Sequence, residues 1–401
     1  MLINKGLLRG SLILLIAFNV YNALNFFFHF AMVRLLSVVE YGILASLYSI
    51  IYVLAVFTES IQTVITKYTT KEENKGKLKN ILKKGIKKSF FVSSGLFILY
   101  LIISIPLSFM LRISYPLMAL NGLMILLAFL TPVSRGVLQG KKRFGFLGIN
   151  MIGEASIKFI LSLILVMVGW AVYGAILGTI VGISISLILS FDGLKDIIRT
   201  KEEKADTEGI YGYTRPAFFI IFVILAFYSI DILIARIFFS EEMAGSYAIA
   251  SILAKTIFFG TQPISRAMFP ISAENSMEKS KSDNIFMNAL AIFCVGIVIV
   301  LALFYFFPDF ILKIFSGKEI PESVSILFYL GIAVSLISFA NLVLLHKLSL
   351  GKVKGYIYLF IFLILEIFLL SWFSKDLMQF SIAFITASAA FLWGSVVLIS
   401  E

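Results

Sequence analysis

Runs of about 20 apolar residues, the length that a helix needs to cross a bilayer core of about 30 Å, recur along the whole chain between short polar stretches. This pattern predicts an all-α integral membrane protein with twelve transmembrane helices. The predicted spans cover residues 8–33, 41–66, 88–111, 115–138, 146–169, 171–190, 216–238, 244–271, 285–307, 323–345, 355–373 and 377–399.

The composition agrees with a bilayer as the solvent of this chain. Of 401 residues, 60% are hydrophobic and 14% are charged, whereas an ordinary soluble domain has about 45–50% apolar residues. The single cysteine, Cys294, falls within the predicted span 285–307. We therefore expect no intrachain disulfide and no cysteine-based metal site.

The distribution of the basic residues along the chain matches the predicted topology and does not form one patch. If both termini are cytoplasmic, 26 of the 34 Lys and Arg residues lie on the cytoplasmic side, two lie within spans and six lie opposite. By the positive-inside rule we expect a multi-pass protein of the cell (plasma) membrane with cytoplasmic N- and C-termini. The net charge of +11 then indicates no nucleic-acid partner. The lysine-rich segment 67–88 is a topological anchor on this interpretation, and binding of anionic lipids there is the alternative.

The two halves of the chain repeat each other. Between the first two spans the sequence reads Ser37-x4-Gly42, and between the seventh and eighth it reads Ser240-x4-Gly245, an offset of 203 residues. Six spans per half is an even number, so both halves enter the membrane from the same side. The repeats are therefore predicted to be parallel, related by an axis along the membrane normal.

A second match lies further along each half. Gly140-Lys141 follows the fourth span and Gly351-Lys352 follows the tenth, at an offset of 211 residues. The repeat predicts three parts: residues 1–190 as an N-terminal six-helix bundle, 191–214 as a cytoplasmic linker and 215–401 as a C-terminal six-helix bundle.

Polar and ionisable residues within the spans are the candidate functional residues. Each charged side chain costs about 2.5–3.5 kcal/mol to insert at the centre of a membrane helix, so such residues usually face a bundle interior or a water-filled cavity. The candidates are, as substrate-binding cations, Lys255, Arg266, Lys158, Arg34 and Arg236; as coupling or gating groups, Asp231, Glu59, Glu154 and His29; and as polar cavity lining, Asn19, Asn22, Asn25, Gln62 and Gln262.

Each charged candidate also has a structural interpretation. Glu154 and Lys158 stand at i and i+4, which favours an intrahelical ion pair, and the functional alternative offers Lys158 to a substrate phosphate. Asp231 serves either packing, through a hydrogen bond to a neighbouring helix, or ion coupling. Lys255 and Arg266 either contact substrate or a partner, or snorkel toward the membrane surface.

Several sequence signatures of enzymes are absent. The chain has no G-x-x-x-x-G-K-[ST] phosphate loop and no H-E-x-x-H metal motif, and its predicted external loops are short. We therefore expect no enzyme, no cofactor and no bound catalytic metal. Movement of a substrate would depend on a substrate gradient or on a coupling ion, H+ or Na+.

Three stretches carry a resemblance to a known family: Arg34–Ala45 (Arg-Leu-Leu-Ser-Val-Val-Glu-Tyr-Gly-Ile-Leu-Ala), Arg135–Gly140 and Asp231–Ala250. With them, nearly the whole chain resembles the polysaccharide transport (Wzx-like) family of oligosaccharide-lipid flippases. That family lies in the superfamily that also contains MATE multidrug exporters. The resemblance implies two six-helix bundles that form a V around a central cavity and alternate between inward and outward openings.

Three functions follow as alternatives. The resemblance implies a flippase that moves a glycan on a polyisoprenoid phosphate or diphosphate from the cytoplasmic to the outer leaflet, and cations such as Lys255 and Arg266 favour it. The second is an ion-coupled exporter of drugs or small amphipaths, and the third is a non-transporting membrane scaffold for glycan assembly. The expected partners are membrane lipids, the lipid-linked glycan and, for the scaffold above all, glycan-assembly enzymes.

Overall fold

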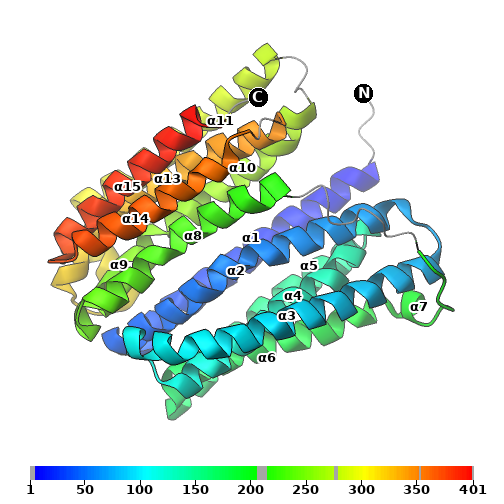
Figure 1. The fold of residues 1–401 in the computed structure, drawn as a ribbon, viewed down its shortest axis with the longest axis horizontal. Coiled ribbons are helices and arrows are strands. Elements are labelled where there is room, and N and C mark those ends of the chain that lie inside the picture. Colours follow the sequence, from blue (N-terminus) through cyan, green and yellow to red (C-terminus); the bar gives the residue numbers. More distant parts are fainter. Residues whose placement is uncertain (1–4, 206–214, 275–278, 352–353, 400–401) are drawn as a thin grey trace. The chain divides into compact units, whose positions relative to one another are not determined.

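The computed structural model describes residues 5–205, 215–274, 279–351 and 354–399, and its regular elements are helices (Figure 1). The chain divides into two compact units, which are Met1–Leu36 with Leu54–Thr214, and Ser37–Val53 with Arg215–Glu401. In the described part of the chain, ten helical segments are long and apolar enough to cross a membrane. One of them, Phe144–Asp192, holds two helices, and Tyr356–Trp372 is a further, shorter apolar segment. The predicted all-α membrane fold is confirmed.

The first unit contains the helices of the first half. They are α1 (Lys5–Leu35), the second part of α2 (Val38–Lys71), α3 (Lys75–Leu111), α4 (Tyr115–Gly140), α5 (Phe144–Leu165), a π-helical turn (Val166–Trp170), α6 (Ala171–Asp192) and the short α7 (Lys195–Ile198).

The second unit contains the remaining helices and the first part of α2. They are α8 (Arg215–Phe238), α9 (Glu241–Ala254), α10 (Thr256–Glu274), α11 (Lys279–Phe306), the short α12 (Pro308–Ser316), α13 (Pro321–Ser349), a 3-10 turn (Tyr356–Tyr358), α14 (Leu359–Trp372) and α15 (Leu377–Val397).

Close helix packing in the first unit depends on glycine. A Cβ atom at Gly182 of α6 would lie 2.9 Å from the backbone nitrogen of Lys158 and 3.0 Å from the carbonyl oxygen of Glu154. Small residues let membrane helices approach until their backbones touch. This approach brings α6 against the part of α5 that carries Glu154 and Lys158.

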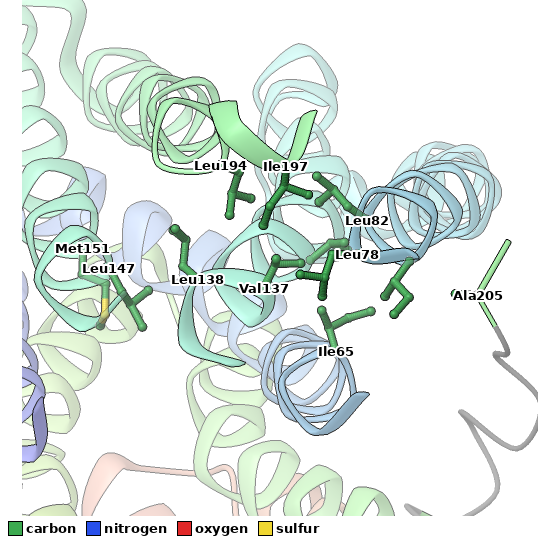
Figure 2. Packing of buried hydrophobic residues seen from close by; sticks show 12 residues of the cluster. Ile65, Leu78, Leu82, Val137, Leu138, Leu147, Met151, Leu194, Ile197 and Ala205 are labelled. Carbon is green, nitrogen blue, oxygen red and sulfur yellow. The ribbon is translucent and has the colours of Figure 1, made fainter. Parts of the chain in front are cut away.

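The predicted linker 191–214 begins with residues that pack onto the first unit. Leu194, Ile197 and Ala205 are buried against residues of α2, α3, α4 and α5, such as Ile65 and Leu78 (Figure 2). Up to residue 205 this segment therefore belongs to the hydrophobic core of the unit. Residues 206–214 lie outside the described residues.

Hydrogen bonds and ion pairs hold the same segment to the start of α3 and to the α4–α5 turn. Asp196 accepts two hydrogen bonds from Arg143, at 2.7 and 2.8 Å, and its Oδ2 lies 3.0 Å from Lys75 Nζ. Glu202 accepts from Asn80 at 2.7 Å and from Lys83 at 2.8 Å. We call residues 191–205, held in this way, the connector.

The two repeat glycines meet within the second unit. A Cβ atom at Gly42 of α2 would lie 2.8 Å from the Cα atom of Gly245 in α9, so the two helices pack backbone to backbone. The first part of α2, residues 37–53, therefore groups with the second unit, although the sequence analysis placed it in the bundle 1–190.

Candidate functional site

A charged cluster is enclosed within the second unit. Lys255 Nζ lies 2.7 Å from Asp231 Oδ1, and Asp231 Oδ2 accepts hydrogen bonds from Ser251 Oγ at 2.7 Å and Tyr247 OH at 3.0 Å. Asp231 is 0% exposed and Lys255 is 1% exposed. The carboxylate therefore has donors on both oxygens, which is what a charge buried away from water requires.

The helix geometry allows this pair to form. Lys255 stands where α9 ends and α10 begins, and its backbone N–H donates to the carbonyl oxygen of Ser251 at 2.8 Å. Its ammonium lies over the ring of Tyr228 on α8, 4.8 Å from the ring centre, a distance at which a cation is attracted to an aromatic face. The cation is thus held by one carboxylate and one ring.

A second carboxyl adjoins this pair. Glu366 of α14 is 0% exposed, and neither of its carboxyl oxygens has a hydrogen-bond partner in the described part of the chain. It lies close enough to Asp231 and Lys255 for their charges to act on it. The cluster therefore contains two acids and one base in a dry interior, and one further positive charge would make it neutral.

The first unit contains a second buried polar cluster, centred on an arginine of α4. Arg135 Nη2 lies 2.7 Å from Glu154 Oε2 and donates to Ser186 Oγ at 2.8 Å, while its Nε donates to Asn150 Oδ1 at 2.8 Å. Tyr21 of α1 donates to the other carboxylate oxygen of Glu154 at 3.2 Å. Four helices, α1, α4, α5 and α6, contribute to this cluster.

Glu154, which the helical spacing placed one turn before Lys158, is engaged by a residue of another helix. Arg135 of α4 pairs with it across the α4–α5 contact. Lys158 Nζ donates to Asn25 Oδ1 at 2.8 Å and lies 4.2 Å from the ring centre of Phe28. Lys158 therefore links α5 to α1.

Two further candidates, His29 and Arg236, are buried, and a third, Gln62, is half-buried. His29 is 8% exposed, and its ring contacts Phe28 edge-on at 5.3 Å. Arg236 is 1% exposed, and its guanidinium lies 3.7 Å from the carboxylate of Glu241 at the start of α9. Gln62 donates to Gln139 Oε1 at 2.8 Å. The contacts of Arg236 and Gln62 join neighbouring helices, whereas the ring contact of His29 lies within α1.

The remaining candidates are more exposed. Arg34 is exposed and lies over the ring of Phe30, 4.3 Å from its centre. Asn25 is half-buried, and so is Gln262. The other four candidates are exposed side chains, namely Asn19, Asn22, Glu59 and Arg266. Lys255 and Arg266 thus differ in surroundings, since only Lys255 is enclosed.

Some site residues were not among the sequence candidates. Arg135 belongs to the family-like stretch Arg135–Gly140, but its place at the end of a span suggested a boundary rather than an interior. Tyr247 and Ser251 are neutral and gave no charge signal. Glu366 was visible as an in-span acid, at offset 212 from Glu154, close to the repeat offset. The repeat was therefore the signal that pointed to it.

The clusters can hold charge and protons but do not resemble a metal centre. Among the described residues, no group of three or more His, Cys, Asp or Glu side chains converges as metal ligands. Their chemistry consists of buried ion pairs in two sets, one in each unit.

Comparison with known proteins identifies the family. The family described as polysaccharide biosynthesis protein matches residues 31–325 of the chain. An uncharacterised membrane protein of Methanocaldococcus jannaschii is 25% identical over 262 residues, which are 60% of each of the two chains. The chain thus matches less than two thirds of that relative.

Solved structures with the same fold are transporters. An inward-facing multidrug resistance MATE family transporter superposes with a TM-score of 0.75 over 94% of both chains, at 14% identity. A transporter of the same MOP superfamily from Pyrococcus furiosus gives a TM-score of 0.62 over 98% of this chain and 94% of its own, also at 14% identity. The chain is a multi-pass membrane protein with the fold of these transporters, and it belongs to the polysaccharide biosynthesis protein family.

Proposed function

We propose that this protein is a flippase that moves a lipid-linked oligosaccharide, carried on a polyisoprenoid phosphate or diphosphate, from the cytoplasmic to the outer leaflet. The observation that carries the proposal is the match of residues 31–325 to the polysaccharide biosynthesis family in a chain with a transporter fold. A glycan headgroup is too polar to cross the hydrocarbon core unaided, so a lipid-linked glycan needs a protein that lets its headgroup pass.

The cations of the chain suit a phosphate-bearing substrate. Arg34 and Arg266 are exposed side chains within their units and offer planar guanidinium donors that pair with phosphate oxygens. Lys158, Lys255 and Arg236 are held by partners and would reach a phosphate only if those partners are exchanged. We therefore propose the two exposed arginines, each within its own unit, as contacts of the headgroup, with Asn19, Asn22 and Gln262 as polar lining.

We further propose that the protein couples transport to protons through the second-unit cluster. Asp231 and Lys255 neutralise each other, so Glu366 is left as an enclosed carboxyl with no hydrogen-bond partner among the described residues, and an ionised carboxylate there would be very costly. A bound proton removes that cost. A sodium ion would need several oxygen ligands, and Lys255 already occupies the Asp231 side. Glu59 and His29 are secondary candidates for the same role, whereas Glu154 is engaged by Arg135.

The flippase proposal is tested in proteoliposomes that contain a lipid-linked oligosaccharide. The readout is the fraction of glycan that becomes accessible to a non-permeant glycan-modifying enzyme outside. We expect transfer with wild type, and a loss of at least ten-fold with Arg266→Gln and with Arg34→Gln. Lys375→Gln removes one exposed charge elsewhere and serves as the control. Absence of transfer of any polyisoprenoid-linked glycan, from folded protein and under imposed proton or sodium gradients, would overturn the proposal.

The coupling ion is tested in the same vesicles. A proton gradient is expected to accelerate wild-type transfer, and Glu366→Gln is expected to leave a slow transfer that no longer responds to that gradient. A sodium gradient that accelerates wild type at constant pH would identify sodium as the coupling ion instead.

An exporter of small amphipaths is the second candidate, and an aromatic cluster in the second unit favours it. Tyr228 packs against Phe258 with ring centres 4.9 Å apart and against Phe259 at 5.9 Å, and Tyr52 lies 6.2 Å from Tyr228. Aromatic faces of this kind bind cationic amphipaths. Efflux of a fluorescent organic cation that is not inhibited by lipid-linked glycan would support this candidate.

We also propose the plasma membrane as the location, with both termini in the cytoplasm, on the strength of the Lys and Arg distribution. Reporter fusions to the two ends test this topology. We also propose that glycan-assembly enzymes contact the cytoplasmic face of the protein. Cross-linking in cells that make the polysaccharide tests these contacts.

A further inference from the structure

Helix α3 is longer than a membrane requires. It spans 37 residues, Lys75–Leu111, which at 1.5 Å per residue is about 55 Å. Its apolar part, residues 89–111, accounts for about 34 Å and matches the hydrocarbon core. The first four turns, residues 75–88, therefore project about 20 Å beyond the core. They contain seven lysines and no acidic residue.

The connector occupies one side of this projection. Lys75 and Lys83 pair with Asp196 and Glu202, at 3.0 and 2.8 Å, and Lys79 Nζ donates to the carbonyl oxygen of Thr200 at 2.9 Å. The other acids of the connector are engaged as well. Asp192 lies 3.1 Å from Lys195, and Glu203 accepts from Asn74 at 2.7 Å.

The lysines of the other side point away from the connector. Lys84, Lys87 and Lys88 are exposed and fall within about 100° of one another around the helix axis. Seven residues after Lys84, at nearly the same angle, stands the exposed Phe91, and Ile98 and Ile102 continue the line. One face of α3 thus changes from cationic to apolar where the helix enters the membrane.

This face has a gap just below the lysines. Gly95 is exposed, and a Cβ atom added there would meet nothing within 4 Å. It stands one turn beyond Phe91 and one turn before Ile98, both of which are large and exposed. An acyl chain that runs along the helix finds room at Gly95 between two apolar side chains.

We propose that this face, defined by Lys84, Lys87, Lys88, Phe91 and Gly95, is a binding site for an anionic phospholipid of the leaflet on the lysine-rich side. The phosphate lies among the three ammonium groups, and an acyl chain lies along Phe91, Gly95 and Ile98. Charge complementarity selects the occupant, because the acids of the connector are already engaged and the membrane itself supplies phosphates at this depth. The inference does not depend on what the protein transports.

The expected gain in affinity follows from the lysine count. Each lysine close to an anionic membrane surface strengthens binding about five-fold, so three together contribute on the order of 100-fold. A zwitterionic lipid with the same chains gains little from them, because its own cationic group opposes the lysines.

Native mass spectrometry of the full chain in detergent tests the site. Purified protein is titrated with phosphatidylglycerol, with phosphatidylcholine of the same chains and with a polyisoprenoid phosphate. We expect wild type to prefer phosphatidylglycerol to phosphatidylcholine by at least ten-fold. The triple variant Lys84→Gln/Lys87→Gln/Lys88→Gln is expected to lose that preference. Gly95→Trp, which fills the gap without changing charge, is expected to weaken phosphatidylglycerol binding several-fold.

The matched control is Lys195→Gln/Lys201→Gln/Lys204→Gln, which removes the same charge from the connector. Each variant is compared only if it keeps the wild-type melting temperature. If the triple variant is destabilised, Gly95→Trp still tests the site. An unchanged preference in folded variants, or an equal loss in the control, would overturn the proposal. Tighter binding of the polyisoprenoid phosphate than of phosphatidylglycerol at this face would overturn the assignment to phospholipid and identify a substrate contact.

Discussion

Lys255 and Asp231 stand 24 residues apart on different helices, yet their charged atoms lie 2.7 Å apart in the interior of the second unit. Tyr247 and Ser251 complete the hydrogen bonding of the carboxylate. Because both charged groups are enclosed, each depends on the other for its charge to be tolerated. The pair therefore connects α8 to the break between α9 and α10.

Removal of one member of this pair should destabilise the protein more than removal of both. Asp231→Asn or Lys255→Gln leaves an uncompensated buried charge, which costs about 3–5 kcal/mol, and the double variant should recover much of that loss. Unfolding in detergent, followed by circular dichroism, measures the effect. Lys313→Gln, which breaks the exposed pair with Glu319, is the control and should change little. Equal losses in single and double variants would contradict this account.

Replacement of Glu366 should stabilise the protein rather than destabilise it. Glu366→Leu removes a buried carboxyl that has no hydrogen-bond partner in the described structure, and we expect a gain of about 1 kcal/mol in unfolding free energy. The same variant should abolish the response of transport to a proton gradient. A loss of stability as large as that of Asp231→Asn would mean that Glu366 is ionised and paired.

Arg135 should not be replaceable by lysine. Its guanidinium serves Glu154, Ser186 and Asn150 at once, and an ammonium group has neither the fork geometry nor the reach. We expect Arg135→Lys to cost about 2 kcal/mol or more, since hydrogen bonds to charged groups contribute about 1.5–3 kcal/mol. Arg34→Lys, at an exposed position, is the control. Thermal unfolding followed by tryptophan fluorescence compares them.

The contact between the repeat glycines predicts a steric effect. Gly245→Ala places a methyl group against the backbone carbonyl group of Val38, and overpacking of this kind costs about 1–3 kcal/mol. Gly296→Ala adds the same methyl group where nothing lies within 4 Å, and it should be neutral or stabilising because alanine favours the helix. Melting temperatures of the two variants give the comparison.

The connector should loosen only in strong acid. Hydrogen bonds from Arg143 and then Lys75 lower the pKa of Asp196 well below its usual range, and Lys83 and Asn80 lower the pKa of Glu202. Stability from such depressed groups is present above the ordinary carboxyl pKa of about 4 and is lost as pH falls through the folded pKa. Hydrogen exchange of residues 194–205 should therefore stay slow at pH 4 and rise below it.

Arg143→Gln provides the matched test of this pH dependence. It returns the pKa of Asp196 toward its usual value, so the rise in exchange should begin at a higher pH than in wild type. Lys142→Gln removes a neighbouring charge that makes none of these bonds and serves as the control. Exchange that is fast at pH 7 in wild type would contradict the described contacts.

Apolar run length predicted the helical membrane fold because the bilayer fixes the length of a span. The same reasoning did not predict the partition of α2 at residues 53 and 54, because hydropathy does not report which neighbour a helix contacts. Nor did it predict α12, whose nine residues are too few for a span.

Candidate residues were found more readily than their partners. Three of the candidates, Asp231, Lys255 and Glu154, were found because a charged side chain within a membrane span is costly and therefore rare. Pairing depends on three-dimensional packing. The helical spacing of Glu154 and Lys158 indicated a local partner for Glu154, and the structure adds Arg135 from α4. Which of these residues act in transport stays a prediction.

The lysine-rich start of α3 has a consequence for how the chain is made. A stretch with so many cations resists passage through an insertion machinery, so with the proposed cytoplasmic termini we expect the segment between the second and third helices to be retained as soon as it is synthesised. On this proposal, the orientation of α2 and α3 is set before most of the chain has been synthesised. Each later helix would then take its orientation from the helices inserted before it. The fewer charges of the second half need only be consistent with that orientation.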